Sequence, residues 1–254
     1  MKKIILMAAA LFCVMGTVKA QEAASMVDIN ADTRSAAMGD LATAAEASAF
    51  SVFSNVAAAP LSEKSVQVGA FYSPWASGLT KGLESKNMLL GAGAYFTFAE
   101  RHSVQLGFRF LKSAGSVGFD QQGNPTKDAF DPKDMTVDLG YGIRIIDNFS
   151  VGVAGHYVNS KIGEGASGSA IAFDVAMMYR LALGEKSNLD LGLKAANIGT
   201  KLAYGEGAGA ALPGKATLGA MFGVKPSDAH SIKVGVDLGY KFMGIGGFVA
   251  GVGA

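Results

Sequence analysis

The chain has 254 residues, a formal net charge of +1, 34 glycines and a single cysteine, and half of its residues are hydrophobic. A charge so close to neutral excludes a strong general attraction to nucleic acid. One cysteine excludes a disulfide or a thiolate metal site within the chain. The length fits one domain, and no stretch has the composition of a linker that would divide it.

Residues 1–20 have the pattern of a secretion signal. Two lysines precede an apolar stretch over residues 4–18, and small residues end it at Ala20. We expect cleavage after Ala20, export through the Sec pathway and a mature chain without Cys13. The alternative, a transmembrane anchor, is disfavoured because the apolar stretch is short.

The next segment, residues 21–64, is predicted to be a periplasmic leader followed by a helical plug or lid. Residues 21–30 form the short leader. Residues 33–50 are rich in alanine and compatible with a helix, and Asp32 or Thr33 can cap its start. The alternative is a plain amphipathic helix beneath the rest of the domain, without a functional part.

An alternation of apolar residues with polar or small ones recurs from residue 65 almost to the C-terminus. It places Val137 and Leu139 on one face of a strand, and Asp138 and Gly140 on the other. Because side chains alternate across a strand, this pattern predicts one apolar face and one polar or small face. We expect strands at 65–75, 88–98, 103–112, 134–145, 149–158, 170–183, 188–197, 214–224 and 231–242, with another opening at Gly247.

The links between these strands alternate in length. Short links at 99–102, 146–148, 184–187 and 225–230 alternate with longer ones at 76–87, 113–133, 159–169 and 198–213. Outer-membrane barrels have short periplasmic turns and longer extracellular loops, so the sequence predicts an all-β fold, a transmembrane antiparallel β-barrel. The N-terminal segment would then start in the periplasm. A secreted β-sandwich also alternates its faces, but it has no reason to sort its links by length.

Charged residues of both signs fall on the predicted inner face. They are Arg109, Asp138, Arg144, His156, Asp174, Arg180, Asp190, Lys194, Lys233, Asp237 and Lys241. Because the signs are mixed, we favour ion pairs that fix the barrel shape over a selective channel or a polar ligand site. No histidine has a second ligand at metal spacing, and there is no nucleophile elbow or catalytic triad. The sequence therefore indicates no enzyme activity, no cofactor and no metal.

A short run near the N-terminus resembles the entry motif of the PorV/PorQ family of outer-membrane barrels. The run is Arg34, Ser35, Ala36, Ala37, Met38, Gly39 and Asp40. The family pattern before the first outward strand is matched up to Asn55, whereas residues 56–60 replace its Asn-Pro-Ala step. Gly39 permits a close approach or a positive φ, and Ala36, Ala37 and Met38 can press against a glycine-lined inner wall. The resemblance covers residues 31–254.

The resemblance implies a fold like that of the FadL-type transporters and a role in the type IX secretion system of Bacteroidetes-like bacteria. There, PorV-type proteins receive substrates from the translocon and deliver them to the surface attachment machinery. The implied partners are outer-membrane lipid, other secretion components and the C-terminal domains of cargo proteins. We expect loops 76–87, 113–133 and 198–213 to make these contacts, and simple solvated connections are the alternative. The individual candidates are Asp120, Asp128, Phe130, Asp131 and Tyr204.

Two other hypotheses remain open. A FadL-like passage for hydrophobic small molecules requires an apolar pocket, which Leu89, Tyr95, Met178 and Met221 can line from the inner face. A purely structural small barrel requires none. The sequence ends within the strand that opens at Gly247, and it holds fewer strands than the resemblance implies. Since a barrel in lipid must close, the chain either closes as a smaller barrel or is a truncated relative, and we favour truncation.

Overall fold

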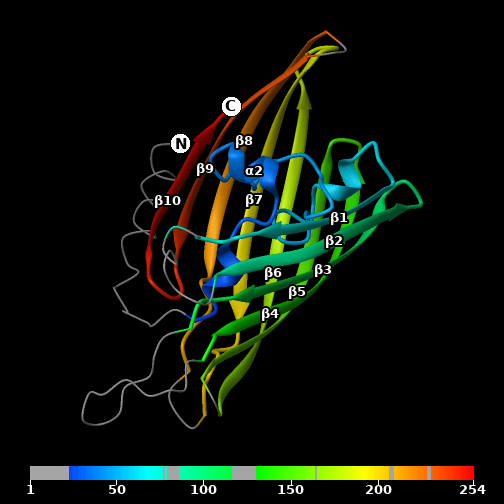
Figure 1. Cartoon of the computed structure of the whole chain (residues 1–254). Coiled ribbons are helices and arrows are strands. Elements are labelled where there is room, and N and C mark those ends of the chain that lie inside the picture. Colours follow the sequence, from blue (N-terminus) through cyan, green and yellow to red (C-terminus); the bar gives the residue numbers. More distant parts are fainter. Residues whose placement is uncertain are drawn as a thin grey trace, which may run out of the picture.

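The computed structural model describes residues 23–76, 78, 86–115, 130–163, 165–205, 209–227 and 230–254. Within these ranges, ten strands form one antiparallel sheet whose order in space is the order along the chain (Figure 1). The strands are β1 (Val66–Ser73), β2 (Met88–Phe98), β3 (His102–Lys112), β4 (Lys133–Ile146), β5 (Phe149–Gly163), β6 (Ala166–Ala182), β7 (Ser187–Gly199), β8 (Lys215–Ser227), β9 (His230–Lys241) and β10 (Gly247–Gly253). The predicted strands are confirmed, with bounds shifted by a few residues. The predicted secretion signal lies outside the described residues.

The two faces of the sheet differ as the alternation predicts. On β4, Val137 and Leu139 are 50% and 59% exposed, whereas Asp138 between them is fully buried. Phe173 on β6 and Leu238 on β9 also point outward and are more than half exposed. An apolar outer face suits contact with hydrocarbon, and the inner face encloses small and polar side chains. No helix among the described residues is long and apolar enough to cross a membrane.

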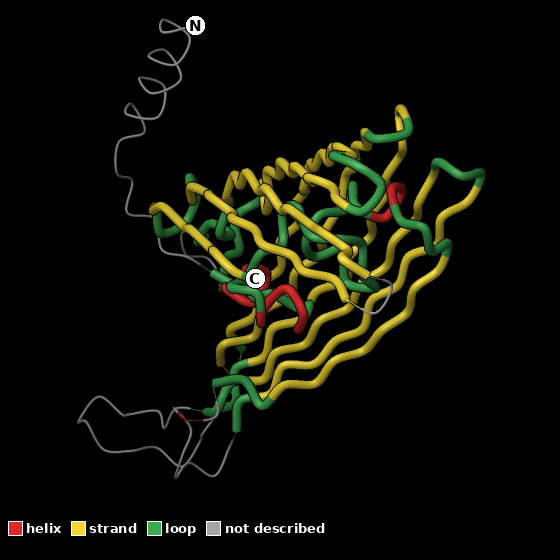
Figure 2. Tube along the Cα trace, turned by 90° about the horizontal axis from the view of Figure 1, so that it is seen from above, coloured by secondary structure: helices red, strands yellow, loops and turns green. Residues whose placement is uncertain are grey.

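The sheet curves into a wall around the N-terminal segment (Figure 2). β1 and β10 stand at the two ends of the strand order. Each of them pairs with one neighbour, β2 and β9 respectively, and no ladder joins them to each other among the described residues. The wall is therefore an open barrel with two free edges in the part of the chain that the structure describes.

Short turns lie at one end of this wall and longer links at the other, which we call the short-turn end and the long-link end. The prediction of a long link at 159–169 is wrong, because β5 runs to Gly163 and β6 begins at Ala166. Gly165 has φ of +74°, as a tight hairpin turn often requires. Ser160 is buried and Lys161 is exposed, so the strand alternation continues into the predicted loop.

Residues 23–64, which we call the plug, lie inside the wall (Figure 2). The plug contains η1 (Ser25–Asp28), α2 (Thr33–Ala37) and η2 (Ala59–Leu61). The carboxylate of Asp32 caps α2, since it accepts hydrogen bonds from the backbone of Arg34 and Ser35 at 3.0 and 3.4 Å. The predicted cap at Asp32 is confirmed.

The prediction of a helix over residues 33–50 is wrong beyond Ala37. Gly39 and Asp40 have φ of +74° and +63°, and this left-handed backbone ends the helix. The backbone amide of Met38 still donates to the carbonyl of Arg34, at 3.2 Å. After this turn the chain follows the inner wall in short turns, because packing against the strands replaces the helical hydrogen bonds.

The plug runs along the lumen from one end to the other. At the long-link end, the Ala23 amide donates to the Ala211 carbonyl at 3.0 Å, and Met26 packs with Leu89. At the short-turn end, the Ser62 hydroxyl lies 2.8 Å from the hydroxyl of Tyr95. The N-terminal segment is predicted from the sequence to start on the short-turn side, whereas the first described residue, Ala23, lies at the long-link end.

Candidate functional site: a plug held in a polar lumen

Glycines on the inner wall let the plug backbone come close to the strands. A Cβ at Gly192 on β7 would collide with the Thr43 carbonyl, and a Cβ at Gly251 on β10 would collide with the Gly39 carbonyl. A side chain at either position would therefore displace the plug from the wall. The expected glycine-lined wall is present, but Ala36 and Ala37 do not pack on it, since both are exposed.

The motif residues of the plug hold a compact turn. Ser35 is 3% exposed. Its hydroxyl donates to the Leu41 carbonyl at 2.6 Å and accepts from the Asn30 amide at 2.8 Å. Arg34 instead extends to the surface, 3.4 Å from the Glu46 carboxylate. The Ser35 hydroxyl thus stabilises the turn of the motif from within. The Arg34 side chain is half exposed and lies at the short-turn end.

Asn55 connects the plug with itself and with the wall. This side chain is fully buried. Its amide nitrogen donates to the carbonyls of Thr43 and, on β6, Met177, at 2.6 and 3.2 Å. Its amide oxygen accepts from the Ala57 backbone at 2.9 Å. Because both ends of the side chain amide are used, no other residue of this size satisfies the same three groups.

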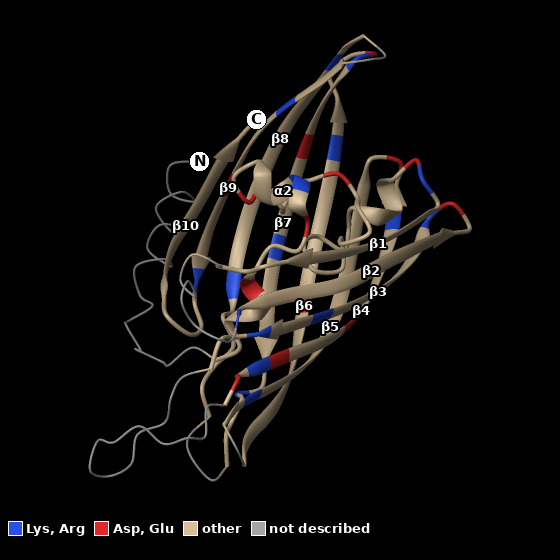
Figure 3. Cartoon of the chain, in the orientation of Figure 1, with Lys and Arg blue, Asp and Glu red and all other residues tan. Residues whose placement is uncertain are grey.

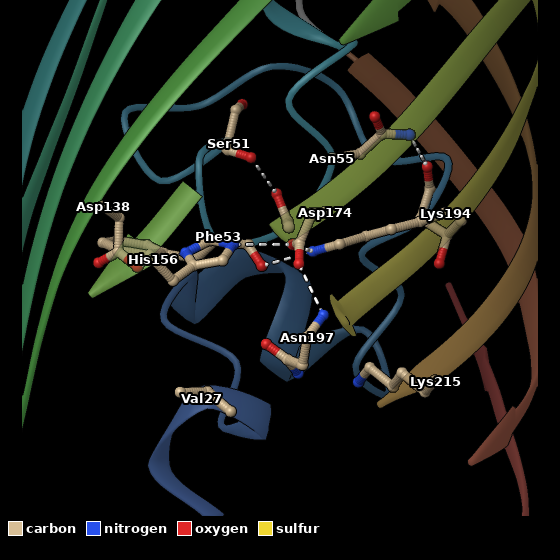
Figure 4. A network of polar contacts seen from close by, with 12 residues as sticks. Val27, Ser51, Phe53, Asn55, Asp138, His156, Asp174, Lys194, Asn197 and Lys215 are labelled. Carbon is tan, nitrogen blue, oxygen red and sulfur yellow. Dashed lines mark hydrogen bonds and ion pairs between the residues drawn. The ribbon is translucent and has the colours of Figure 1, made fainter. Parts of the chain in front are cut away.

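A row of five charged or titratable side chains crosses the inner wall, one from each strand between β3 and β7. They are Arg109, Asp138, His156, Asp174 and Lys194, and each is at most 7% exposed. Along the row, the N–O distances between neighbours are 3.5, 2.5, 3.2 and 2.8 Å (Figure 4). The predicted pairing of lumen charges is confirmed for this row. Figure 3 shows that basic and acidic residues are interspersed over the strands instead of grouped by sign.

The two cations at the ends of this row also bind the plug. The Arg109 guanidinium donates to the Val27 carbonyl at 3.3 Å and lies 4.4 Å from the centre of the Phe53 ring. The Lys194 ammonium donates to the Phe53 carbonyl at 3.0 Å (Figure 4). Removing one member of a buried ion pair typically costs about 3 to 5 kcal/mol, because the partner is left buried and unpaired. The row therefore fixes both the wall and the position of the plug.

Asp28 anchors the first turn of the plug to the long-link end of the wall. Its carboxylate contacts Lys215 on β8, and it lies 2.7 Å from the Lys241 ammonium on β9. Burial alone would raise the pKa of Asp28, but the two lysines together hold the pKa below its ordinary value of 3.8. The role of Asp28 was not predicted from the sequence. The available signal was an acidic residue in a segment that was expected to lie inside a wall with inward-pointing lysines.

A second pair of anchors holds the middle of the plug to β9. The Asp237 carboxylate accepts hydrogen bonds from the backbone of Ala42 and Thr43 at 3.0 and 2.9 Å. The Glu46 carboxylate contacts Lys233. Burial favours a higher pKa for Glu46, yet Lys233 and the nearby arginines lower it overall. The contact between Glu46 and Lys233 was also not predicted from the sequence. The opposite charges of the two residues were the only signal for it.

A cavity of about 250 Å³ remains between the plug and the wall. Arg109, Lys194 and Lys215 line it together with Asp28 and Asp237. Both signs of charge therefore meet in this cavity, and they also meet in a second cavity of about 480 Å³, which Arg34, Glu46 and Arg180 help to line near the short-turn end. Ile29, Phe50 and Phe53 also line the first cavity, so an apolar ligand would find apolar side chains there but would have to displace water from the charged groups.

The prediction that Leu89, Tyr95, Met178 and Met221 line an apolar pocket is wrong. All four are buried. Leu89, Met178 and Met221 pack in three separate clusters, each of which includes plug residues. The Tyr95 hydroxyl is engaged in hydrogen bonds near the short-turn end. These side chains pack against the plug and stabilise its position. The plug therefore occupies the volume that an apolar ligand would need.

The candidate loop contacts fall into two groups. Asp120 and Asp128 lie outside the described residues. The other three are near the long-link end: Phe130 lies under the Lys161 ammonium, Asp131 is paired with Lys112 at 2.7 Å, and the Tyr204 hydroxyl is 2.7 Å from that of Ser160. Burial raises the pKa of Tyr204. Phe130 and Asp131 thus lie in the β3–β4 link, and Tyr204 lies in the β7–β8 link at the same end of the wall.

The remaining histidines have ordinary polar partners. His102 Nδ1 is 2.6 Å from the Tyr141 hydroxyl, and His230 Nδ1 is 2.9 Å from the Ser227 hydroxyl. Among the residues that the structure describes, no group of three or more histidine, cysteine, aspartate or glutamate residues is arranged to hold a metal ion.

Comparison with known proteins gives a match over most of the chain. Residues 17–243 match the model of the family described as "Type IX secretion system protein PorV". The crystal structure of the Pseudomonas putida toluene transporter TodX is similar at 11% identity and a TM-score of 0.46, covering 86% of this chain and 75% of that one. A deltaS2 mutant of the TodX monoaromatic hydrocarbon channel is 12% identical, with a TM-score of 0.45 and coverage of 87% and 74%. No curated protein sequence matches.

Proposed function

Because the chain belongs to the PorV family of type IX secretion proteins, we propose that it receives exported proteins at the outer membrane and hands them to the surface attachment machinery. Its chemistry is binding and not catalysis. The proposed partners are the C-terminal domains of cargo proteins and other secretion components. In this account, residues 1–20 are a secretion signal that is removed after Ala20.

The anchored plug is the observation that supports binding at the mouth of the barrel over passage through its lumen. Plug and wall are joined by Asn55, by the two ends of the charged row and by Asp28. The cavities of about 250 and 480 Å³ between the plug and the wall are each far too small for a folded domain. We therefore assign cargo contact to the long-link end, where Phe130, Asp131 and Tyr204 lie.

A passage for hydrophobic small molecules is the weaker alternative. The plug occupies the place of the apolar pocket that this passage requires, and charged side chains line both cavities beside the plug. An apolar ligand there would displace water from ionic groups without replacing its hydrogen bonds, which is costly. This alternative predicts saturable binding of long-chain ligands by the purified protein.

Deletion of the gene and complementation test the proposal. We expect deletion to reduce the amount of exported protein attached to the cell surface, and the wild-type chain to restore it. An Asp131→Ala variant should restore less. Asp147→Ala is the matched control, because Asp147 is an exposed aspartate in a turn at the opposite end. The Asp131→Ala change removes the ion pair with Lys112 and the hydrogen bond that the carboxylate accepts from the Gly115 amide at 2.9 Å, so we expect it to cost about 1 to 2 kcal/mol of local stability.

Two outcomes would contradict the proposal. One is an unchanged amount of surface-attached protein in the deletion strain. The other is equal complementation by the two aspartate variants, which would remove the long-link end from cargo contact. Saturable binding of a long-chain fatty acid together with normal surface attachment would favour the alternative.

A further inference from the structure

Three lysines stand side by side on the outer face of the wall at the long-link end. Lys112 on β3, Lys133 on β4 and Lys161 on β5 are direct Cα partners across neighbouring strands. We call them the lysine row. Lys133 and Lys161 are exposed, and the Lys112 side chain is 32% exposed. The three strands lie next to each other inside the strand order (Figure 1), and each has a paired neighbour on both sides.

Lysines in this arrangement repel each other. Directly opposite residues of antiparallel strands have Cβ atoms about 5 Å apart, and like charges there are destabilising. The Asp131 carboxylate pairs with Lys112 at 2.7 Å. Three ammonium groups and this one carboxylate sum to a net charge of +2, so the repulsion is only partly relieved. An anion that lies across the row would relieve the rest.

Two side chains of the β3–β4 link hold the outer members of the row. The Lys161 ammonium lies 5.4 Å from the centre of the Phe130 ring. Asp131, which pairs with Lys112, is itself fixed because its carboxylate accepts a hydrogen bond from the Gly115 amide at 2.9 Å. Lysines that are already held in place lose less conformational freedom when they bind a ligand.

The lysine row borders the apolar part of the outer face. On β4, every outward side chain from Met135 to Ile145 is apolar or aromatic, and these two residues are ten positions apart. Ten steps of a strand cover about 33 Å, and at a tilt of about 40° they span about 25 Å of membrane, which is the height of the apolar band in outer-membrane barrels. Lys133 is the next outward residue beyond this stretch. Its ammonium group therefore lies at the level of the lipid headgroups.

The opposite end of the same strands has no such basic row. Its turns carry Glu100, Arg101 and Asp147, in which the signs are mixed. The outward His102 and Tyr141 lie beside these turns, and their side chains are 2.6 Å apart. Longer links mark the extracellular end of an outer-membrane barrel. The lysine row therefore faces the outer leaflet, whose glycolipids carry phosphate groups.

Neutral polar side chains extend the lysine row onto β6. Ser167 is the direct Cα partner of Lys161, and Ser169 is the next outward residue of the same strand. Both serines are exposed. Serine hydroxyls both donate and accept hydrogen bonds, as sugar hydroxyls require, and lysine ammonium groups bind phosphate. The combination fits a phosphorylated sugar better than a simple anion.

We propose that the lysine row binds a phosphate group on the sugar of an outer-leaflet glycolipid. The acyl chains of this lipid then lie along outward apolar side chains such as Phe110 and Met135, which are direct partners one step below the row. This inference goes beyond the proposed handover of cargo, and it needs only the outer-membrane location of the family.

Lipid A binding to the purified chain in detergent tests the proposal, with native mass spectrometry as the readout. The probes are phosphorylated lipid A, enzymatically dephosphorylated lipid A and inorganic phosphate. The variant carries Lys112→Gln, Lys133→Gln and Lys161→Gln. We expect it to bind phosphorylated lipid A at least about tenfold more weakly than the wild type, since each basic side chain near a charged lipid surface contributes about fivefold. We expect the wild type, but not the variant, to prefer the phosphorylated form.

The matched control removes the same charge at the short-turn end. It carries Lys64→Gln, Lys186→Gln and Lys225→Gln, at three exposed positions, and it should bind lipid A as the wild type does. Heat-modifiable migration on a semi-native gel shows whether each variant is assembled. If the triple variant of the lysine row does not assemble, Lys133→Gln alone should still weaken binding by about fivefold.

Four results would overturn the proposal. Equal affinity of the wild type and the assembled lysine-row variant for phosphorylated lipid A would remove the row from lipid binding. Equal affinity of the wild type for both forms of lipid A would show that the acyl chains alone are bound, and equal affinity for inorganic phosphate would make free phosphate the ligand. Failure of Lys133→Gln to assemble would give the row a structural role. Loss of binding to a purified cargo C-terminal domain with unchanged lipid A binding would assign it to a protein partner.

Discussion

Replacing Asn55 with leucine should release the plug from the wall. Leucine has a similar size but no polar atoms, so it excludes water and leaves three buried backbone groups without partners: the carbonyls of Thr43 and Met177 and the amide of Ala57. Each group left unpaired in a buried place costs about 1 to 3 kcal/mol. The seated plug should therefore lose roughly 3 to 9 kcal/mol relative to the released plug.

Limited proteolysis of the purified protein in detergent measures this loss. Trypsin should cut after Arg34, which lies in the helix α2, only when this part of the plug unfolds locally, and the rate then follows the population of the open state. Since each 1.4 kcal/mol is a factor of ten in an equilibrium, a loss of about 3 kcal/mol accelerates cleavage roughly a hundredfold. Heat-modifiable migration on a semi-native gel shows whether the wall itself is intact.

Asn159→Leu is the matched control for this prediction. Asn159 is half-buried and makes one long side-chain hydrogen bond, 3.4 Å from its amide nitrogen to the Gly168 carbonyl. Its replacement should change the cleavage rate by no more than about threefold, as expected for a change near 0.5 kcal/mol. Equal cleavage rates for the Asn55→Leu variant and the wild type would refute the anchoring role of Asn55.

Three further predictions concern the plug and the long-link end. Gly192→Val should expose the plug to trypsin, because the new side chain collides with the Thr43 carbonyl, whereas Gly155→Ala should not, since the nearest atom to its Cβ is 3.6 Å away. The depressed pKa of Asp28 means that its carboxylate stabilises the seated plug above about pH 4, and that this contribution is lost as the pH falls through the depressed value. An Asp28→Asn variant should show faster cleavage at neutral pH and a flatter dependence on acid; the same slope as the wild type would exclude the anchor. Tyr204→Phe removes a hydroxyl bonded to β5 and should lower thermal stability by about 1 kcal/mol at most, while reduced cargo binding beyond this effect would indicate direct contact.

The strands could be predicted because their signal is local. A period of two in the sequence fixes which residues face lipid, and it placed Asp138, His156 and Asp174 on the inner face before any partner was known. The sequence could not show that neighbouring members of this row lie within 2.5 to 3.5 Å of each other. Those distances depend on the register of the strands, which side-chain alternation alone leaves open.

The path of the plug could not be predicted from the same kind of pattern. Residues 33–50 favour a helix by composition, yet Gly39 ends it and contacts with the wall determine the rest. Asn55 was noted only through the family resemblance, because its role depends on a carbonyl of β6 that is 122 positions away in the sequence. The hairpin at Gly165 was missed because its glycine and serine residues are also typical of a loop.

A photo-crosslinking amino acid at position 130 tests the proposed function most directly. In living cells, we expect it to form adducts with the C-terminal domains of exported proteins, identified by mass spectrometry, while the same group at position 147 in the opposite turn forms none. Adducts at position 130 would place the cargo at the long-link end. The same adducts at both positions, or none at position 130 in cells that are secreting cargo, would contradict the account.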